Sequence, residues 1–473
     1  MGIVWGDITA EDILTPSGGK LVAGSGKTVF PGISTDSRDI PSGHLFWVLK
    51  GESHDGHNYV KGALEKGAGG VVLENPALAE IPKGVNPAVI RVPDTLKALG
   101  DLAHWWRKHH DIPIAAVTGS VGKTTTKEIA ATILELGAPT LKNKGNYNNL
   151  IGLPLTLLSM EEAHRRAVLE MGMNRPGEIA RLTDIADPDI GLITNVVMAH
   201  LEGLGDMDGI ARAKAELVER ISPRAVVLLN GDDERLMRTA EPFGKKIRTF
   251  GMEGRRDFLA TKVRNMDRAG AAFELHYEGK VLPLRLRVPG LQYIPNALAA
   301  CALALSLGED PENLVQGLER FRGFKGRFMP VSLSGGVTLL DDTYNANPTS
   351  LRAALSSLRD LSGGEGRIIA GLGEMLELGE ETESAHREAG EMVAEFGVYH
   401  LVALGDHARD IVRGAVDQGL PAERTETVES REEMAARLMD IMKEGDLILV
   451  KGSRGMALER VVDLMMDRPS EEK

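Results

Sequence analysis

The sequence predicts an α/β protein in which strands and helices alternate around mainly parallel sheets. Its 473 residues are more than one compact core usually holds, and its hydrophobic (42%) and charged (26%) fractions are those of a globular protein. From about residue 111 onward, short apolar runs alternate with segments of helical periodicity, as in doubly wound sheets. We therefore expect a small α/β domain over residues 1–110, a central domain with a mainly parallel sheet over 111–322, and a Rossmann-like doubly wound domain over 323–473.

The net charge limits the partners of the chain. It has 55 Lys and Arg residues against 68 Asp and Glu residues, a formal net charge of −13. Sequence-independent binding of nucleic acid requires a basic face, so we expect no nucleic-acid partner, whereas a small anionic ligand needs only a local positive site. The N-terminus shows no signal peptide and no stretch reaches the length of a membrane span, so we expect a cytoplasmic enzyme without membrane insertion.

Short elements are expected in the first domain. Residues 71–73 and 88–92 are typical of strands, residues 58–66 of a helix, and residues 96–109 of a helix that links to the next domain. The string Gly-Ser-Gly-Lys-Thr at 24–28 looks like a phosphate loop. The proline and glycine that soon follow prevent the helix which such a loop requires, so we interpret it as a turn.

A second string in this domain combines hydroxyl groups with an arginine. Thr35, Asp36, Ser37 and Arg38 come directly after a short apolar run, and glycines follow at 43 and 51. Arginine offers a bidentate fork to phosphate, so this string suits a phosphate or sugar ligand. Loop hydroxyls and charges are also commonly just solvated, and the string alone does not decide between these readings.

Residues 118–126 (Thr-Gly-Ser-Val-Gly-Lys-Thr-Thr-Thr) form the strongest motif. They follow an apolar run at 112–117 and precede good helix formers at 127–134. A strand, a glycine turn and a helix with Lys123 and Thr124 at the turn make a phosphate cradle, in which backbone N–H groups face the anion and a hydroxyl holds Mg²⁺. The general P-loop has four residues between its glycines, and this one has two. An ordinary glycine turn is the alternative, but the strand–helix context favours nucleotide binding.

Two strand ends near this loop carry candidate metal ligands. A strand at 167–172 contains Glu170 near its end, and His200 follows a strand at 190–196. Parallel strands place their C-terminal ends beside the phosphate loop, so both side chains are plausible ligands. Either one alone would be read as a partly buried polar group. The loop at 143–154 contains four asparagines, and its composition fits ligand contact and a structural loop about equally.

The rest of the central domain is less specific. Lys214 lies in a helix at 209–217, where a lysine normally faces solvent. A segment rich in β-branched residues and turns follows at about 247–289, and an apolar helix over 290–307 is entered through Pro295 and Asn296.

The third domain alternates strands and helices to the end of the chain. We expect strands at 337–341, 367–370, 400–404 and 447–450, and helices from Thr349 and at 384–394, 408–417, 431–442 and 456–466. Polar strings follow the strands at 341–348, 371–375 and 451–454, at the edge where open α/β sheets bind ligands.

Together these strings resemble the Mur ligase family, the ATP-dependent amide ligases of peptidoglycan precursor synthesis, over essentially the whole chain. The shortened phosphate loop is the form found in that family. The string at 341–350 is close to the branch that adds D-alanyl-D-alanine, and residues 373–379 with His386, residues 451–454 and residues 35–38 support the match. The resemblance implies ATP and Mg²⁺ as cofactors, UDP-N-acetylmuramoyl-tripeptide and D-alanyl-D-alanine as substrates, and a monomer.

The resemblance also implies roles for individual residues. The loop residues that would cradle ATP are Gly119, Ser120, Val121, Gly122, Lys123, Thr124 and Thr125. Lys123 would contact the β- and γ-phosphates and Thr124 would hold Mg²⁺. Glu170 and His200 would hold a second Mg²⁺, and Lys214 matches a position that is carbamylated in family members. We therefore expect the catalytic set to be Lys123, Lys214, His200 and Glu170.

The remaining implied contacts come from all three domains. Asn296 and Arg327 would reach ATP, and Asp342 its ribose. Asn345 and Asn347 would lie near the incoming dipeptide, while Thr35, Asp36, Ser37 and Arg38 would bind the uridine diphosphate. One departure is visible: the usual Gly-Arg-His-Asn of the family reads Gly290-Leu291-Gln292-Tyr293 here. Tyr293 should change the size and shape of the adenine site.

Other functions fit the sequence less well. A sister ligase that adds diaminopimelate or L-lysine, or a ligase like folylpolyglutamate synthase, would leave the string at 341–350 unexplained. A nucleotide-dependent regulatory ATPase that forms no bond would not need the string at 35–38, nor Glu170 and His200 as a metal pair.

Overall fold

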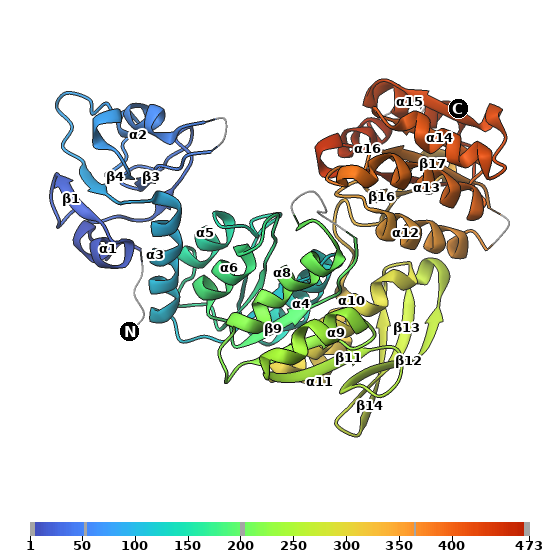
Figure 1. The fold of residues 1–473 in the computed structure, drawn as a ribbon, viewed down its shortest axis with the longest axis horizontal. Helices are drawn as coiled ribbons and strands as arrows, with labels where there is room; N and C mark the ends of the chain where they lie inside the picture. Colours follow the sequence, from blue (N-terminus) through green and yellow to red (C-terminus); the bar gives the residue numbers. More distant parts are fainter. Residues whose placement is uncertain (1–4, 52–53, 199–203, 364–365, 468–473) are drawn as a thin grey trace.

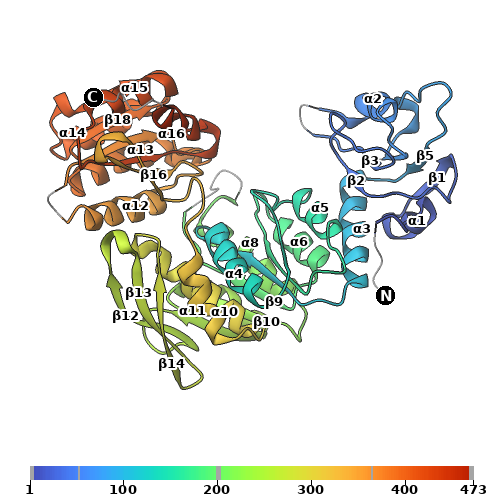
Figure 2. The same cartoon turned by 180° about the vertical axis from the view of Figure 1, so that it is seen from behind.

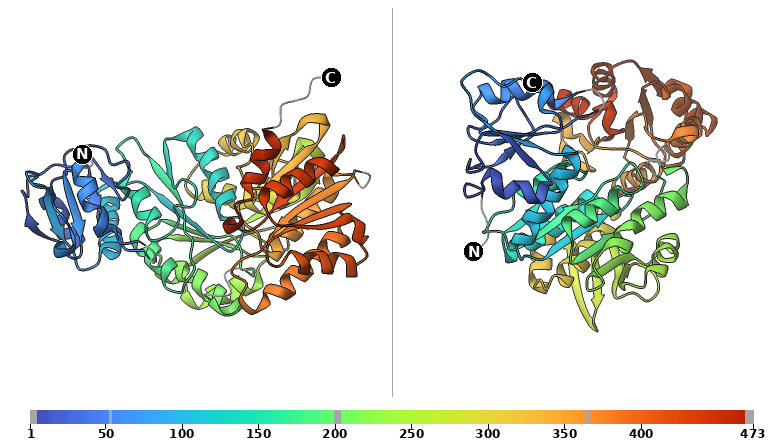
Figure 3. Two further views of the ribbon diagram at one scale, coloured as in Figure 1. Left: turned by 90° about the horizontal axis from the view of Figure 1, so that it is seen from above. Right: turned by 60° about the vertical axis from the view of Figure 1, so that its left-hand side comes forward.

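Three sheets succeed one another along the chain (Figure 1). The computed structural model describes residues 5–51, 54–198, 204–363 and 366–467. The N-terminal part (blue) and the C-terminal part (red) lie at the two ends of the molecule, with the central part between them, as seen also from behind (Figure 2) and from above (Figure 3). Among the described residues, no helix has the length and apolar character needed to cross a membrane.

The N-terminal sheet has five strands in the order β1-β5-β4-β3-β2. β1 is antiparallel to β5 and the other pairs are parallel. Its elements are α1 (Ala10–Ser17), β1 (Lys20–Ala23), β2 (Ile33–Ser34), β3 (Leu45–Trp47), α2 (Val60–Glu65), β4 (Gly70–Leu73) and β5 (Ala88–Arg91). No helix follows the string at 24–28, which confirms that it is not a phosphate loop.

The helix α3 (Thr95–His109) joins this sheet to the next one. Asp94 caps its N-terminus by accepting a hydrogen bond from the Lys97 amide, and three basic residues in its last turn suit the negative end of the helix dipole. Its buried face packs against α1 on one side and against α5 and α6 of the central part on the other. One continuous apolar core therefore runs through α3 and couples the first two parts.

The central sheet has nine strands in the order β14-β13-β12-β11-β10-β9-β6-β8-β7. Strands β6 to β12 are parallel, and the hairpin strands β13 and β14 are antiparallel additions. Its strands are β6 (Ile114–Thr118), β7 (Thr140–Lys142), β8 (Arg166–Glu170), β9 (Ile190–Ile193), β10 (Val226–Asn230), β11 (Lys246–Gly251), β12 (Phe258–Asn265), β13 (Ala271–Tyr277) and β14 (Lys280–Leu286).

Helices cover both faces of this sheet. They are α4 (Lys123–Gly137), α5 (Gly152–Leu158), α6 (Glu178–Ala186), α8 (Met207–Arg220), α9 (Glu234–Ala240), α10 (Ile294–Ser306) and α11 (Pro311–Arg320). Successive residues of a strand point to opposite faces, so Ala115 and Val117 of β6 share a core with α4 and α10, while Ala116 shares one with α6 and α8. The chain reaches β8 on one side of β6 and β9 on the other, which makes the C-terminal end of β6 a topological switch point.

The C-terminal sheet has six strands in the order β15-β16-β20-β17-β18-β19, parallel except for β15. Its strands are β15 (Met329–Ser332), β16 (Thr338–Asp342), β17 (Ile368–Gly373), β18 (His400–Leu404), β19 (Thr425–Val428) and β20 (Leu447–Lys451). Its helices are α12 (Pro348–Leu361), α13 (Thr382–Glu395), α14 (Ala408–Asp417), α15 (Arg431–Ile441) and α16 (Glu459–Met466). The expected α/β class is confirmed, whereas the short strands β7, β15 and β19 were not anticipated.

Candidate active site

The phosphate loop connects β6 to α4 at the switch point. Two of its glycines are required by space and by backbone angle. Gly119 has φ +143°, and a Cβ there would lie 1.9 Å from Thr194 Oγ1. Gly122 has φ +86°, and a Cβ there would lie 2.0 Å from Oδ1 of Asn296. The loop can therefore take this shape only with glycine at both positions.

Asn195, which follows β9, holds the loop through hydrogen bonds to its backbone. Sequence analysis did not predict Asn195 as a site residue. The amide of Ser120 donates to the carbonyl of Asn195 (3.0 Å), and the amide of Val121 donates to its Oδ1 (2.9 Å). These two amides are therefore hydrogen-bonded to Asn195. Donors that remain for an anion include the amide of Gly122 and the first-turn amides of α4, which have no intrahelical acceptor.

Lys123 begins α4 and is folded over the loop. Its Nζ donates to the carbonyls of Gly119 (2.8 Å) and Ser120 (3.1 Å). Desolvation lowers the pKa of Lys123, while the Glu170 carboxylate acts in the opposite direction. Among the described residues, the hydrogen-bond partners of this ammonium group are the two backbone carbonyls, so the group can turn to bind an anionic ligand.

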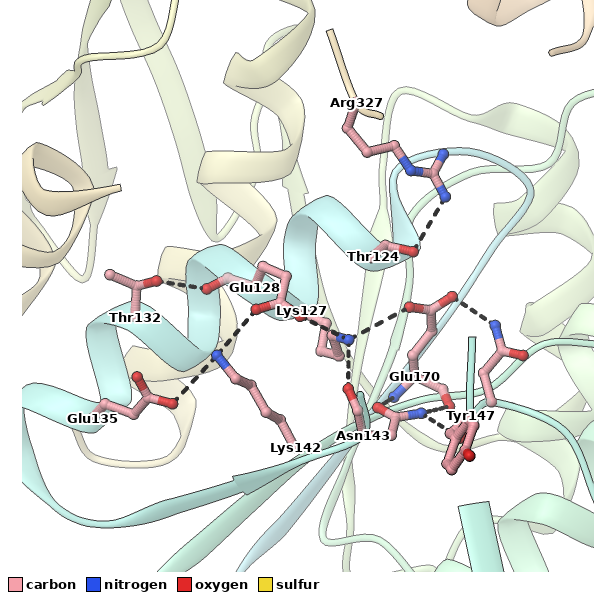
Figure 4. A network of polar contacts seen from close by, with 11 residues as sticks. Thr124, Lys127, Glu128, Thr132, Glu135, Lys142, Asn143, Tyr147, Glu170 and Arg327 are labelled. Atoms are coloured by element: carbon pink, nitrogen blue, oxygen red, sulfur yellow. Dashed lines mark hydrogen bonds and ion pairs between the residues drawn. The ribbon is translucent and has the colours of Figure 1, made fainter. Parts of the chain in front are cut away.

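Glu170 ends β8 directly beside β6, in register with Val117. Its side chain is buried, and Oε1 accepts a hydrogen bond from Asn148 Nδ2 (2.8 Å). Oε2 has no hydrogen-bond partner among the described residues and lies 4.0 Å from Nζ of Lys127 (Figure 4). Burial of a carboxylate oxygen without a hydrogen bond is unfavourable, and the ion-pair contact with Lys127 is too long to supply one, so a ligand can complete the surroundings of Oε2.

Two charged residues of the C-terminal sheet face the loop as a pair. Asp342 of β16 lies opposite Lys451 of β20, so Lys451 Nζ donates to Asp342 Oδ2 (2.6 Å) and to the carbonyl of Asn345 (2.9 Å). Burial raises the pKa of Asp342, against the opposing effect of Lys451, and lowers the pKa of Lys451. The pair fixes the chain that follows β16.

Arg327 connects the linker before β15 to the phosphate-loop helix. Its Nη2 donates to Thr124 Oγ1 (3.3 Å), and its guanidinium lies 3.9 Å from the ring centroid of Tyr344. Its Nε is buried without a hydrogen-bond partner among the described residues. Tyr293, the departure noted above, is buried and donates its hydroxyl to the carbonyl of Arg327, so it holds this linker.

These groups surround one cavity of about 610 Å³ between the central and C-terminal parts. The sequence-predicted residues that line it are Ser120, Val121, Gly122, Lys123, Thr124, Thr125, Glu170, Asn296, Arg327, Asp342, Asn345 and Asn347. Gln292, Tyr293, Tyr344, Asn148 and Lys451 also line it. Gly119 shapes the loop without lining the cavity, and His200 lies outside the described residues.

Two further predicted groups are not among the described lining residues. The side chain of Arg38 is 88% exposed on the N-terminal part and forms a bidentate contact with Asp36, whose pKa these hydrogen bonds lower to about 2. Lys214 of α8 is buried, contrary to the solvent-facing position that a helical lysine normally takes. Burial and the nearby charge of Lys123 hold the pKa of Lys214 well below its usual range.

Few of the described side chains in the cavity could hold a metal ion. The described residues contain no group of three His, Cys, Asp or Glu side chains placed to hold an ion. Oε2 of Glu170, which accepts no hydrogen bond among the described residues, nevertheless provides an anionic oxygen. Thr124 lines the same cavity and offers its hydroxyl. Hard cations such as Mg²⁺ prefer oxygen ligands, so these two groups fit.

Sequence analysis missed several residues that build the site. Lys127 looked like an ordinary helical lysine, but it is fully buried beside Glu170. Asn143 and Asn148 lie in the asparagine-rich loop, whose composition was the one available signal. Tyr344 and Lys451 lie in the polar strings at 341–350 and 451–454, but sequence analysis assigned no role to either residue.

A phosphate loop at the switch point of a parallel sheet, with cationic side chains from a further sheet closing over it, defines a nucleotide-dependent enzyme built from several α/β parts. Models of three domains match the chain: the "Mur ligase family, catalytic domain" over residues 30–107, the "Mur ligase middle domain" over 117–304, and the "Mur ligase, glutamate ligase domain" over 326–454. The chain belongs to the Mur ligase family.

Individual relatives are similar in sequence to this chain over nearly its full length. A curated UDP-N-acetylmuramoyl-tripeptide–D-alanyl-D-alanine ligase of Synechocystis sp. is 39% identical over 93% of this chain and 92% of its own. The ligase of the same name in Bacillus subtilis is 34% identical over 94% of each chain.

Solved structures extend this agreement to the fold. MurF from Acinetobacter baumannii superposes with a TM-score of 0.86 at 33% identity, covering 97% of this chain and 99% of that one. MurF ligase from Thermotoga maritima, solved in complex with ADP, has a TM-score of 0.79 at 27% identity and covers 92% and 97% of the two chains.

Proposed function

We propose that this protein is an ATP-dependent amide ligase that joins D-alanyl-D-alanine to UDP-N-acetylmuramoyl-tripeptide, releasing ADP and phosphate. The observation that carries the proposal is the single cavity in which the phosphate loop, Glu170 and the Asp342–Asn347 segment meet. Five curated relatives that are 31–39% identical to this chain carry the name of this ligase. A folylpolyglutamate synthase (16% identity) and a diaminopimelate-adding ligase (19%) share only the fold.

The first step of the reaction brings two anions together. An oxygen of the C-terminal carboxylate of the tripeptide attacks the γ-phosphorus of ATP, the bond from that phosphorus to ADP breaks, and an acyl phosphate forms. Lys123 and the first-turn amides of α4 neutralise charge on the β- and γ-phosphates. Arg327, with its unpaired Nε, supplies a further positive charge from the opposite wall.

We propose that Thr124 holds one Mg²⁺ and that Glu170 and His200 hold a second, with Lys214 as a further ligand in its carbamylated form. When bound, Mg²⁺ supplies Lewis-acid stabilisation of phosphate charge. An ammonium group cannot bind a metal ion, so we propose that Lys214 is modified to a carbamate. The carbamate forms when the neutral amine attacks CO₂ and releases a proton. The low pKa of the buried Lys214 amine supports this, because only the unprotonated form is a nucleophile.

In the second step the free amine of D-alanyl-D-alanine attacks the acyl carbon, and phosphate leaves from the tetrahedral intermediate. Acyl phosphates hydrolyse readily, so the site must exclude water. The position of the cavity between the central and C-terminal parts supports exclusion by approach of these two parts. Asn345 and Asn347 at the C-terminal wall are the proposed neighbours of the dipeptide, and Asp342 that of the ATP ribose.

We further propose the division into domains at 110/111 and 322/323, since each sheet lies within one of these segments. Thr35, Asp36, Ser37 and Arg38 are the proposed uridine diphosphate contacts. The enzyme would act in the cytoplasm, where ATP is available, and the family resemblance favours a monomer, which sedimentation velocity would test.

The discriminating experiment is ADP release with UDP-N-acetylmuramoyl-tripeptide and D-alanyl-D-alanine, added together and separately. We expect turnover only with both. Turnover that requires a free diamino acid in place of the dipeptide would identify a sister ligase and reject the proposal. Turnover with neither substrate would indicate an ATPase that forms no amide bond.

A further inference from the structure

The asparagine-rich loop between β7 and α5 holds the backbone of Glu170. Asn143 is fully buried, and its side-chain amide makes two hydrogen bonds to that one residue. Its Nδ2 donates to the carbonyl of Glu170 (2.9 Å), and its Oδ1 accepts from the Glu170 amide (2.9 Å). A single side chain thus pairs both main-chain groups of Glu170 and fixes where its Cα lies.

The same loop also fixes the carboxylate. Asn148 Nδ2 donates to Oε1 of Glu170 (2.8 Å), and the carbonyl of Asn148 accepts from the amide of Gly172 (2.8 Å), two residues beyond Glu170. Oε1 is therefore committed to the loop, whereas Oε2 has no hydrogen bond among the described residues. This asymmetry orients one particular oxygen of Glu170 for a ligand.

The Asn148 amide occupies the space that a side chain at position 172 would fill, so its present position requires glycine there. A Cβ at Gly172 would meet three atoms of that one amide group, at 2.8 Å (Oδ1) and 2.9 Å (Cγ and Nδ2). These atoms are the end of a side chain that can rotate away. Alanine at position 172 should therefore fold, but should displace the amide from Glu170.

Lys127 anchors the other end of this arrangement. Its Nζ donates to the carbonyl of Asn143 (2.7 Å) and forms an ion pair with Glu128 (2.9 Å), as Figure 4 shows. The loop is thereby attached to α4, the helix that starts at the phosphate loop. The positions of Glu170 and of the phosphate loop are coupled through this lysine.

We propose that Asn143 and Asn148 form an asparagine clamp that positions the Glu170 carboxylate for the metal ion, with Asn148 setting its orientation. This rests on the proposed function, in which Glu170 is a Mg²⁺ ligand. The clamp residues are positioning residues, because they act through Glu170. Hydrogen bonds to a metal-ligating carboxylate typically raise metal affinity by 10- to 100-fold.

The test is a titration of the full-length protein with Mn²⁺, followed by electron paramagnetic resonance, with and without ADP. We expect Glu170→Gln to remove one Mn²⁺ site of the wild-type protein. Asn148→Ala and Gly172→Ala should weaken the same site by about 10- to 100-fold. Asn149→Ala is the matched control from the same loop, because Asn149 Oδ1 accepts from the amides of Ile151 and Gly152 at the start of α5 and does not contact Glu170. It should lower the melting temperature and leave Mn²⁺ affinity unchanged.

Three results would overturn the clamp. They are wild-type Mn²⁺ affinity in Asn148→Ala, an equal loss of affinity in Asn149→Ala, and retention of every Mn²⁺ site in Glu170→Gln. The readout is independent of ligation, so the two proposals fail separately. If Asn148→Ala and Gly172→Ala bind Mn²⁺ as the wild type does, and the wild-type enzyme still joins the two substrates, only the clamp is refuted. If these variants bind Mn²⁺ more weakly, but the wild-type enzyme does not join the substrates, only the proposed reaction is refuted.

Discussion

Lys123 shows at the scale of one residue how the phosphate loop is prepared for its ligand. Its ammonium group rests on two backbone carbonyls and can move to a phosphate with little rearrangement. We expect Lys123→Ala to abolish turnover, because the charge of the transferring phosphate is then not neutralised. Isothermal titration should show nearly unchanged binding of the UDP-linked substrate. Loss of both properties would indicate misfolding and leave the role of the charge unsupported.

Lys214 differs from Lys123 in having no hydrogen bond or ion pair with another described residue, although it is buried. A buried, unpaired amine is costly unless it is neutral or modified. We expect Lys214→Ala to lose activity, and formate or acetate to restore part of it by replacing the proposed carbamate. Activity assays with a series of short carboxylates will measure this. A fully active Lys214→Ala enzyme would show that the residue has no part in the reaction.

At the scale of elements, Asn347 has a structural role that the sequence did not indicate. It is the N-cap of α12, where its side chain accepts from the Ser350 amide and the Ser350 hydroxyl accepts from the Asn347 amide. Asn347→Ala should therefore cost about 1 kcal/mol of stability, measured by chemical denaturation. Serine is also a good N-cap, so Asn347→Ser should recover most of that loss.

The two variants of Asn347 separate capping from substrate contact. If the residue acts only as a cap, the KM for D-alanyl-D-alanine in Asn347→Ser will equal that of the wild type. If KM rises in both variants while stability recovers in the serine variant, then the side chain also contacts the dipeptide.

Most elements could be predicted because their own residues specify them. The β-branched strand before the phosphate loop and the apolar helix α10 are marked by local pattern. Strands β7 and β19 are only three and four residues long, and their pairing depends on neighbours far along the chain. The burial of Lys127 and Lys214 has the same origin, since each lies in a helix whose local sequence gives no sign of what covers it. Asn148 could be suspected from composition, but its partner Glu170 is known only from the fold.

Lys127 and Lys142 offer a matched pair for measuring how burial changes the value of an ion pair. Both contact Glu128, Lys127 from a fully buried position and Lys142 with 31% of its side chain exposed. Lys127→Met should destabilise the protein by about 3–5 kcal/mol, because it leaves the buried Glu170 carboxylate without its counter-charge and the Asn143 carbonyl without its donor. Lys142→Met should cost less than about 1 kcal/mol. Equal effects in chemical denaturation would show that the buried contacts of Lys127 carry no special weight.

For the whole molecule, the separation of the binding regions restricts the shape of the substrate. Arg38 and its neighbours belong to the N-terminal part, which lies at one end of the molecule (Figure 1). The described lining of the cavity begins only at Ser120. A substrate that is held by both regions must be long, with its anionic end at the N-terminal part and its reacting carboxylate in the cavity. A UDP-linked sugar peptide has this shape.

This separation leads to a prediction about Arg38. Its side chain is 88% exposed, so Arg38→Ala should leave the melting temperature unchanged. The KM for UDP-N-acetylmuramoyl-tripeptide should rise at least about tenfold, as expected for loss of a charge-assisted phosphate contact. The KM for D-alanyl-D-alanine and the affinity for ADP should remain those of the wild type, because the proposed sites of both ligands are in the cavity. A parallel loss of ADP affinity would contradict the separation, since it would mean that the N-terminal part contributes directly to the nucleotide site.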